Sequence, residues 1–197
     1  MRSVGEGYNA GMSDFNLTHH FLVAMPAMQE GFFAGTVTYI CEHNENGALG
    51  IVVNRPINLS LQELLDQINI PMEQTGLAKV PVHFGGPVQT ERGFILHEVH
   101  GNWESSLCIN DRLALTTSKD ILEALAVGRG PRNIIVSLGY AGWDQGQLEH
   151  EVSENTWLTM PASEHILFDL PAEERLAAAM GLLGVEYASL AEDAGHA

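Results

Sequence analysis

The stretch TVTYICEHNENGALGIVV, residues 36–53, decides the fold class of this chain. Its first part, 36–43, is rich in β-branched and aromatic residues, and its last part, 49–53, is almost wholly apolar. Between them lie Asn46 and Gly47, two residue types that tolerate the positive φ angles of tight turns. The stretch therefore predicts a β-hairpin.

Short apolar segments and helical patterns alternate on both sides of this hairpin. Strands are predicted at 21–25, 80–84, 92–98, 105–109 and 112–116, and the apolar run NIIVSL, 133–138, predicts a buried central strand. Helices are predicted from the capping-box pattern at Ser60 to about Asn69, over 118–127 before Gly128, from Asp144 to about Glu154, and over 172–183. We therefore expect an α/β fold of the mixed α+β kind, with a mixed β-sheet packed by several helices.

The length of 197 residues fits one compact domain. Residues 1–11 are polar and glycine-rich, which predicts a disordered leader or a remnant of expression. Residues 12–190 are predicted to form the single domain, and 191–197 a flexible tail. No apolar run is long enough for a membrane-spanning helix, and no signal peptide is evident, so we expect a cytoplasmic protein with reduced thiols.

The net charge of −16 argues against general nucleic-acid binding, because that activity depends on Lys and Arg side chains that neutralise phosphates. An anionic membrane surface is disfavoured for the same reason. The charge is also uneven, since residues 140–197 carry 11 acidic side chains and one basic side chain, Arg175. With nucleic acids and anionic membranes disfavoured, we expect the binding partner to be a protein or a small ligand.

Cys41 and His43 form one candidate site. Side chains alternate along a strand, so these two residues should share a face while Glu42 points away. A thiol beside an imidazole is a pattern of reactive cysteines, and it suggests a redox-sensing thiol. The more ordinary interpretation is that Cys41 is a small apolar residue of the core.

The sequence contains no recognisable catalytic or metal-binding motif. His97-Glu98-Val99-His100 has a spacing one residue too short for the helical zinc motif, and no Walker motif, G-x-S-x-G elbow or CxxC is present. We therefore assign no catalytic residue, metal ion or cofactor. An enzymatic activity is not excluded, but it is disfavoured.

Three loops could together form a ligand-binding cleft. Asn54-Arg55 could offer a guanidinium to a carboxylate or phosphate, and Gly85-Gly86 could offer backbone N–H groups to an anion. Tyr140 and Trp143 could form the wall of a pocket where a glycine-rich turn leads from the central strand into a helix. The alternatives are a tight turn at Gly85-Gly86 and simple aromatic packing over a loop.

Several long blocks of the sequence, in the same order, resemble the YqgE/AlgH family of bacterial proteins. These blocks are HHFLVAMPAM (19–28), CEHNENGALGIVVNRP (41–56), GGPVQTERGFILH (85–97), LGYAGWDQGQLEHEVSENTWL (138–158) and GHA (195–197), and ILFDLPAEERLAAA (166–179) is most similar to the AlgH members of pseudomonads. The resemblance covers residues 12–197. It implies a cytosolic protein with a compact mixed α/β fold. AlgH-like proteins are named for a proposed role as transcriptional regulators of alginate biosynthesis, and the resemblance supplies no catalytic residues.

Two main hypotheses follow from the sequence. The first is a cytosolic regulatory or interaction protein that acts through a protein or a small ligand. The second is a ligand-binding module or enzyme that uses the Asn54-Arg55, Gly85-Gly86 and Tyr140-Trp143 loops as one cleft.

Overall fold

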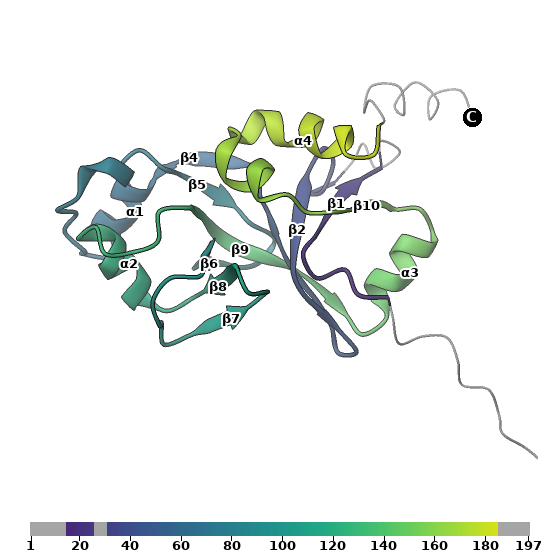
Figure 1. Ribbon diagram of the computed structural model, residues 1–197, viewed down its shortest axis with the longest axis horizontal. Coiled ribbons are helices and arrows are strands. Elements are labelled where there is room, and N and C mark those ends of the chain that lie inside the picture. The colour runs from purple at the N-terminus through teal and green to yellow at the C-terminus, as the bar shows by residue number, and fades with distance from the viewer. Residues whose placement is uncertain (1–14, 26–30, 185–197) are drawn as a thin grey trace, which may run out of the picture.

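One long strand, β9 (Ile134–Asp144), runs through the middle of the molecule and joins its two halves (Figure 1). The computed structural model describes residues 15–25 and 31–184. The first half of β9 pairs antiparallel with β6 (Val88–Glu98) and parallel with β5 (Pro81–Phe84). Its second half pairs antiparallel with β3 (Gly47–Val52). Strand β9 therefore joins the two halves of a single curled sheet.

The full strand order is β10-β1-β2-β3-β9-β6-β8-β7, with β4 and β5 as a branch on β9. Only β5 and β9 are parallel, so the expected mixed sheet is confirmed. Strands β4 and β10 were not expected from the sequence. The remaining strands are β1 (His20–Ala24), β2 (Val37–Asn44), β4 (Pro56–Ser60), β7 (Ser106–Cys108), β8 (Leu113–Thr116) and β10 (Trp157–Pro161).

The helices are short, and they begin and end mostly where the sequence predicts. Ser60 caps the first helix, where it and Glu63 form the expected reciprocal capping box, and Gly128 follows the second with a φ of +72°. None of the described helices is long and apolar enough to cross a membrane. The helices are α1 (Leu61–Gln67), α2 (Lys119–Ala126), α3 (Gln147–Ser153) and α4 (Ala172–Gly181), with a 3₁₀ turn η1 (Thr75–Leu77) and a π-helical turn η2 (His165–Asp169).

Three apolar clusters hold these elements together as a single compact domain. The inner face of the curled sheet packs under α4 and η2, around residues such as Tyr39 and Leu96. The outer face of β5, β6 and β9 packs against α1 and α2, at the left of Figure 1. The outer face of the other half packs against α3 around Trp143 and Trp157.

The predicted hairpin at 36–53 is confirmed, but its turn lies one residue earlier than expected. Glu45 and Asn46 form the turn, and Gly47 is already paired with Asn44 and with Asp144. Gly47 has a φ of +130°, and a Cβ there would lie 2.2 Å from the Trp143 carbonyl oxygen. Glycine is therefore required at this position for the close approach of β9.

The prediction of a turn over 139–143 is wrong, whereas the helix predicted after it is present and begins three residues later than expected. Residues 139–143 continue strand β9, and α3 begins only at Gln147. The reason is tertiary, since β3 pairs with residues 141–144 of the strand, beyond Leu138, the last residue that pairs with β5. Gly139, with a φ of +74°, supplies the kink between the two halves.

The predicted leader 1–11 and tail 191–197 lie outside the described residues, so the predicted boundaries of the domain at 12 and 190 stay predictions.

Candidate functional site

Two adjoining hollows lie on the inner face of the curled sheet, between the β2–β3 hairpin and strands β6, β8 and β7. They have volumes of about 420 and 440 Å³, and both are lined by Glu42, Leu49 and Tyr140. Because they share these residues, we describe them as one groove, the Tyr140 groove. Each hollow has the size of a small-molecule site.

A large bulge in β6 places Arg92 at the first hollow. Val88 pairs with Tyr140 and Gly93 with Leu138, so residues 89–92 of β6 lie opposite the single residue Gly139 of β9. Gln89 in this bulge has a φ of +49°, a strained value for a residue other than glycine. Bulges of this kind redirect side chains, and they are frequent next to functional sites.

The guanidinium of Arg92 is exposed and contacts three neighbouring side chains. It donates hydrogen bonds to Gln89 Oε1 (3.3 Å) and Thr117 Oγ1 (2.9 Å), and its central carbon lies 5.7 Å from the centre of the Phe94 ring. The Phe94 ring also contacts the Tyr140 ring, with 5.3 Å between their centres. Among the described residues, no carboxylate forms an ion pair with Arg92. The groove therefore presents an exposed cation beside an aromatic surface.

The two predicted glycines lie where the chain leaves β5 and crosses closely over β9. The Gly85 N–H donates to the Leu138 carbonyl (2.8 Å), and the Gly85 carbonyl accepts from the Val52 N–H (2.8 Å). A Cβ at Gly86 would lie 2.0 Å from the carbonyl carbon of Tyr140. The N–H of Gly85 therefore donates to the backbone of the protein itself. The absence of side chains at both glycines lets the two backbones cross closely.

Asn54 and Arg55 hold the segment 32–37 in place. Arg55 donates to the Phe32 carbonyl and to the Ala34 carbonyl (2.6 Å), and its guanidinium lies over the Phe32 ring. Asn54 accepts from the Val37 N–H and donates to the Gly35 carbonyl. The polar groups that were predicted to bind an anion therefore bind backbone carbonyls.

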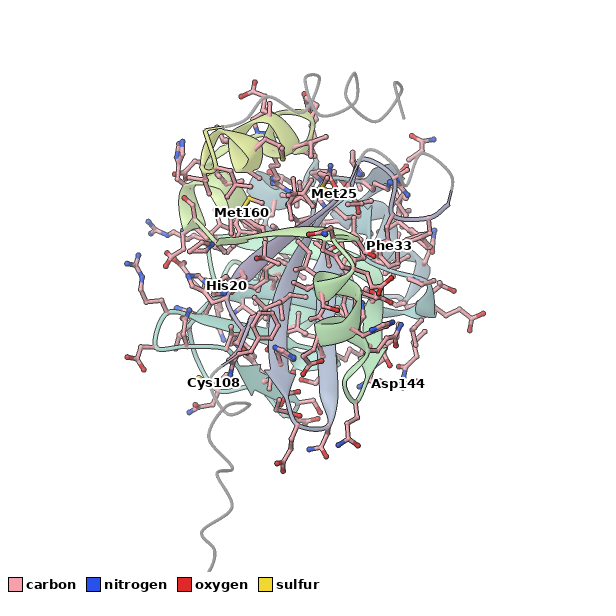
Figure 2. The ribbon with its side chains drawn as sticks, turned by 90° about the vertical axis from the view of Figure 1, so that its right-hand side faces the viewer. His20, Met25, Phe33, Cys108, Asp144 and Met160 are labelled. Carbon is pink, nitrogen blue, oxygen red and sulfur yellow. The ribbon has the colours of Figure 1, made fainter. Side chains whose placement is uncertain are left out.

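Tyr140 and Trp143, the two predicted aromatic residues, lie in different environments. Tyr140 lines both hollows, whereas Trp143 lines only the second and is 6% exposed. The indole of Trp143 stacks on Phe33, labelled in Figure 2, and donates to Glu151 Oε2 (2.9 Å). Of the six residues predicted to share one cleft, these two line the groove, and its two linings do not include Asn54, Arg55, Gly85 or Gly86.

The prediction that Cys41 and His43 share a face is wrong. The pairing of β2 with β3 shifts register between Ile40 and Glu42, and this bulge puts one extra residue, Cys41, into β2. Cys41 packs in the inner cluster and is 1% exposed, and burial raises the pKa of its thiol far above the usual value. These features favour a packing role for Cys41.

His43 points to the opposite face. Its Nδ1 accepts from the Leu17 N–H (3.0 Å), so its Nε2 carries the proton and donates to Glu149 Oε1 (3.1 Å). In His97-Glu98-Val99-His100, the buried His97 bonds to Thr116 Oγ1 and to the Glu98 carbonyl. Within 15–25 and 31–184, no group of three His, Cys, Asp or Glu side chains is arranged to hold a metal ion.

Sequence reasoning missed the polar residues of the groove. Arg92 was expected only as the first residue of a strand, and Glu42 only as the residue that points away from Cys41. Arg92 and Glu42 both line the groove because of two bulges, one in β6 and one in β2. These bulges are defined by the pairing of the strands, which the sequence does not show. The one signal in the sequence is Arg92-Gly93-Phe94, a cation next to a glycine where a polar segment gives way to an apolar one.

The comparisons with known proteins agree with the sequence resemblance. The AlgH-like family model matches residues 21–188. A UPF0301 protein of Nitrosospira multiformis is 58% identical over 186 residues, 94% of this chain and all of that protein. A UPF0301 protein of Azoarcus sp. is 55% identical over 92% of this chain and 97% of its own length.

Two solved structures resemble the fold. The solution structure of the AlgH protein from Pseudomonas aeruginosa has a TM-score of 0.77 at 50% identity, and the match covers 95% of this chain and 99% of that protein. A crystal structure of a Corynebacterium diphtheriae protein has a TM-score of 0.65 at 19% identity over 87% and 90% of the two chains, which supports the fold alone. From the extent of these matches, this chain belongs to the AlgH-like family.

Proposed function

We propose that this protein is a cytoplasmic regulatory protein that binds a small ligand with a negatively charged group in the Tyr140 groove. The observation that carries the proposal is Arg92, an exposed cation that contacts Gln89, Thr117 and Phe94 and lines a hollow of about 420 Å³. A guanidinium recognises a carboxylate or a phosphate through paired N–H donors, and it binds best when its geometry is already set.

The overall charge favours a small ligand over a nucleic acid. The chain carries 25 acidic and 9 basic side chains, so a long polyanion would be repelled over most of the surface. A small anion contacts only the surroundings of Arg92. The regulatory role that the name of the AlgH-like proteins implies would then operate through ligand binding.

The test is a titration of the ¹⁵N-labelled protein with phenyl phosphate, followed by amide chemical shifts. This probe joins an anion to a ring that can lie against Phe94 and Tyr140. We expect the largest shifts at the residues that line the first hollow, and binding at least tenfold weaker in Arg92→Gln. The matched control is Arg129→Gln, since Arg129 is exposed and lies outside the groove.

Shifts spread over the whole surface, or equal binding by Arg92→Gln and Arg129→Gln, would show that phenyl phosphate does not bind in the groove. The proposed function would then be rejected.

A further inference from the structure

We propose that the natural ligand of the Tyr140 groove is a short peptide with free termini, whose carboxylate binds at Arg92 and whose ammonium group binds near Glu42 and Asp144. This inference rests on the proposed function and extends it from an anion to a zwitterion. It follows from the order of charged and apolar side chains along the groove.

The order of the charges follows from which hollow each side chain lines. Arg92 lines only the first hollow, Asp144 only the second, and Glu42 lines both. The groove therefore runs from a cation at one end, past a carboxylate at the junction, to a second carboxylate at the other end. Asp144 is exposed and appears at the lower right of Figure 2.

Neither carboxylate has a cationic partner in the part of the chain that the structure describes. Glu42 accepts one hydrogen bond, from the Asn44 side-chain amide at 3.1 Å, so its carboxylate oxygens can accept further hydrogen bonds. Glu42 and Asp144 make this part of the groove negatively polarised, away from Arg92. They would attract an ammonium group, which offers three donors.

The middle of the groove is apolar and aromatic. Leu49 and Tyr140 line both hollows, and Phe94 lies beside Tyr140 in the first, whereas the indole of Trp143 packs on the outer face of the sheet. A peptide side chain, above all an aromatic one, would cover these rings and exclude water from the charged contacts at both ends. A simple inorganic anion would leave this surface exposed.

The ligand is limited to a short peptide by the size of the groove. The two hollows have volumes of about 420 and 440 Å³, which is the size of a small-molecule site. A folded protein partner would contact a much larger surface than these two hollows provide.

The experiment is calorimetric titration with peptides of two, three and four residues, Gly-Phe, Gly-Phe-Gly and Gly-Phe-Gly-Gly. Each is compared with its N-acetyl form and with its C-terminal amide. We expect at least one unblocked peptide to bind at least tenfold more tightly than both of its blocked forms. Arg92→Gln should abolish the preference over the amide, and the double variant Glu42→Gln/Asp144→Asn should abolish the preference over the N-acetyl form.

Two controls keep the result clear. Arg129→Gln should bind every peptide as the unaltered protein does, because Arg129 lies outside the groove. Circular dichroism and ¹⁵N spectra of each variant establish that it is folded before its affinity is compared.

The outcomes separate this inference from the proposed function. If N-acetyl peptides or phenyl phosphate bind as well as any unblocked peptide and Arg92→Gln weakens them, the ligand is an anion, and the zwitterion is rejected while the proposed function stands. If no peptide binds at millimolar concentration but phenyl phosphate does, the same conclusion holds. If neither the peptides nor phenyl phosphate bind in the groove, both proposals are rejected.

Discussion

At the scale of single residues, the most unusual contact is between two basic side chains under α4. Arg175 is 7% exposed and donates to the carbonyls of Leu170 and Val53, and its Nη1 lies 3.5 Å from Nε2 of the buried His83. His83 Nδ1 donates to the Val136 carbonyl, so Nε2 is free to accept from Arg175. The imidazole is therefore neutral in the folded protein, and it links α4 to the centre of the sheet.

This contact predicts a loss of stability in acid. Burial, with the nearby charge of Arg175, lowers the pKa of His83 from 6.5 to about 4. Below pH 6.5 the unfolded chain binds a proton that the folded protein does not yet bind, so the free energy of unfolding falls as the pH drops from 6.5 to 4. The loss from this group reaches about 3 kcal/mol.

Urea unfolding at pH 7, 5.5 and 4 measures this effect, with His83→Gln as the comparison, because glutamine does not titrate. The free energy of unfolding of the variant should fall less steeply over this range. Parallel curves for the two proteins would mean that His83 is not kept neutral.

The two thiols should differ sharply in reactivity. Cys41 is 1% exposed with a strongly raised pKa, whereas Cys108, labelled in Figure 2, is exposed. We expect a thiol reagent such as DTNB to label one cysteine in the native protein and two in urea. Cys108→Ser should abolish the native reaction. Rapid native labelling in Cys108→Ser would restore the hypothesis of a reactive thiol at Cys41.

At the scale of elements, β9 and the bulges decide where the groove lies, and these are also the features that the sequence could not predict. The hairpin at 36–53, the cap at Ser60 and the end of α2 at Gly128 follow from local rules, and all three are confirmed. The continuation of β9 beyond Gly139 is different. A glycine-rich sequence is typical of a loop. Here the segment forms a strand because its backbone groups pair with those of β3.

The kink of β9 should depend on the absence of a side chain at Gly139. A Cβ there would lie 2.3 Å from the Gly86 carbonyl oxygen, whereas Gly146, which has the same φ of +74°, has no atom within 4 Å. Both alanine variants should lose about 1 kcal/mol from the unfavourable φ. Gly139→Ala should lose about 1–3 kcal/mol more because of the clash.

Urea unfolding of the two glycine variants provides the comparison. Equal losses of stability would show that the close crossing at Gly86 does not constrain β9.

Helix α3 should be attached to the sheet chiefly through Glu151. Its Oε2 accepts from the indole N–H of Trp143 at 2.9 Å and from that of Trp157 at 2.8 Å, and both indoles are buried. Glu151→Ala removes the acceptor of two buried donors, which should cost about 2 kcal/mol or more and shift the tryptophan emission to longer wavelength. Glu154→Ala, an exposed position at the end of the same helix, should change stability by less than about 0.5 kcal/mol. A similar loss in both variants would assign the effect to the helix rather than to the indoles.

At the scale of the whole molecule, the fold places an exposed cation, Arg92, at a groove of a strongly acidic protein. The net charge is −16, and the region 140–197 carries 11 acidic side chains against one basic side chain, the buried Arg175. The sequence predicted this acidity and the exclusion of polyanions that follows from it. It could not predict that Arg92 lies at the groove without an ion-pair partner among the described residues, because that depends on strands β2, β6, β8 and β9 meeting.

Native mass spectrometry of the protein, purified gently from its own host, tests the ligand-binding role of the groove most directly. We expect a stoichiometric small-mass adduct on the unaltered protein and on Arg129→Gln, and its loss from Arg92→Gln. An unaltered protein without any adduct, or an adduct that Arg92→Gln retains in full, would contradict the assignment of the Tyr140 groove as the binding site.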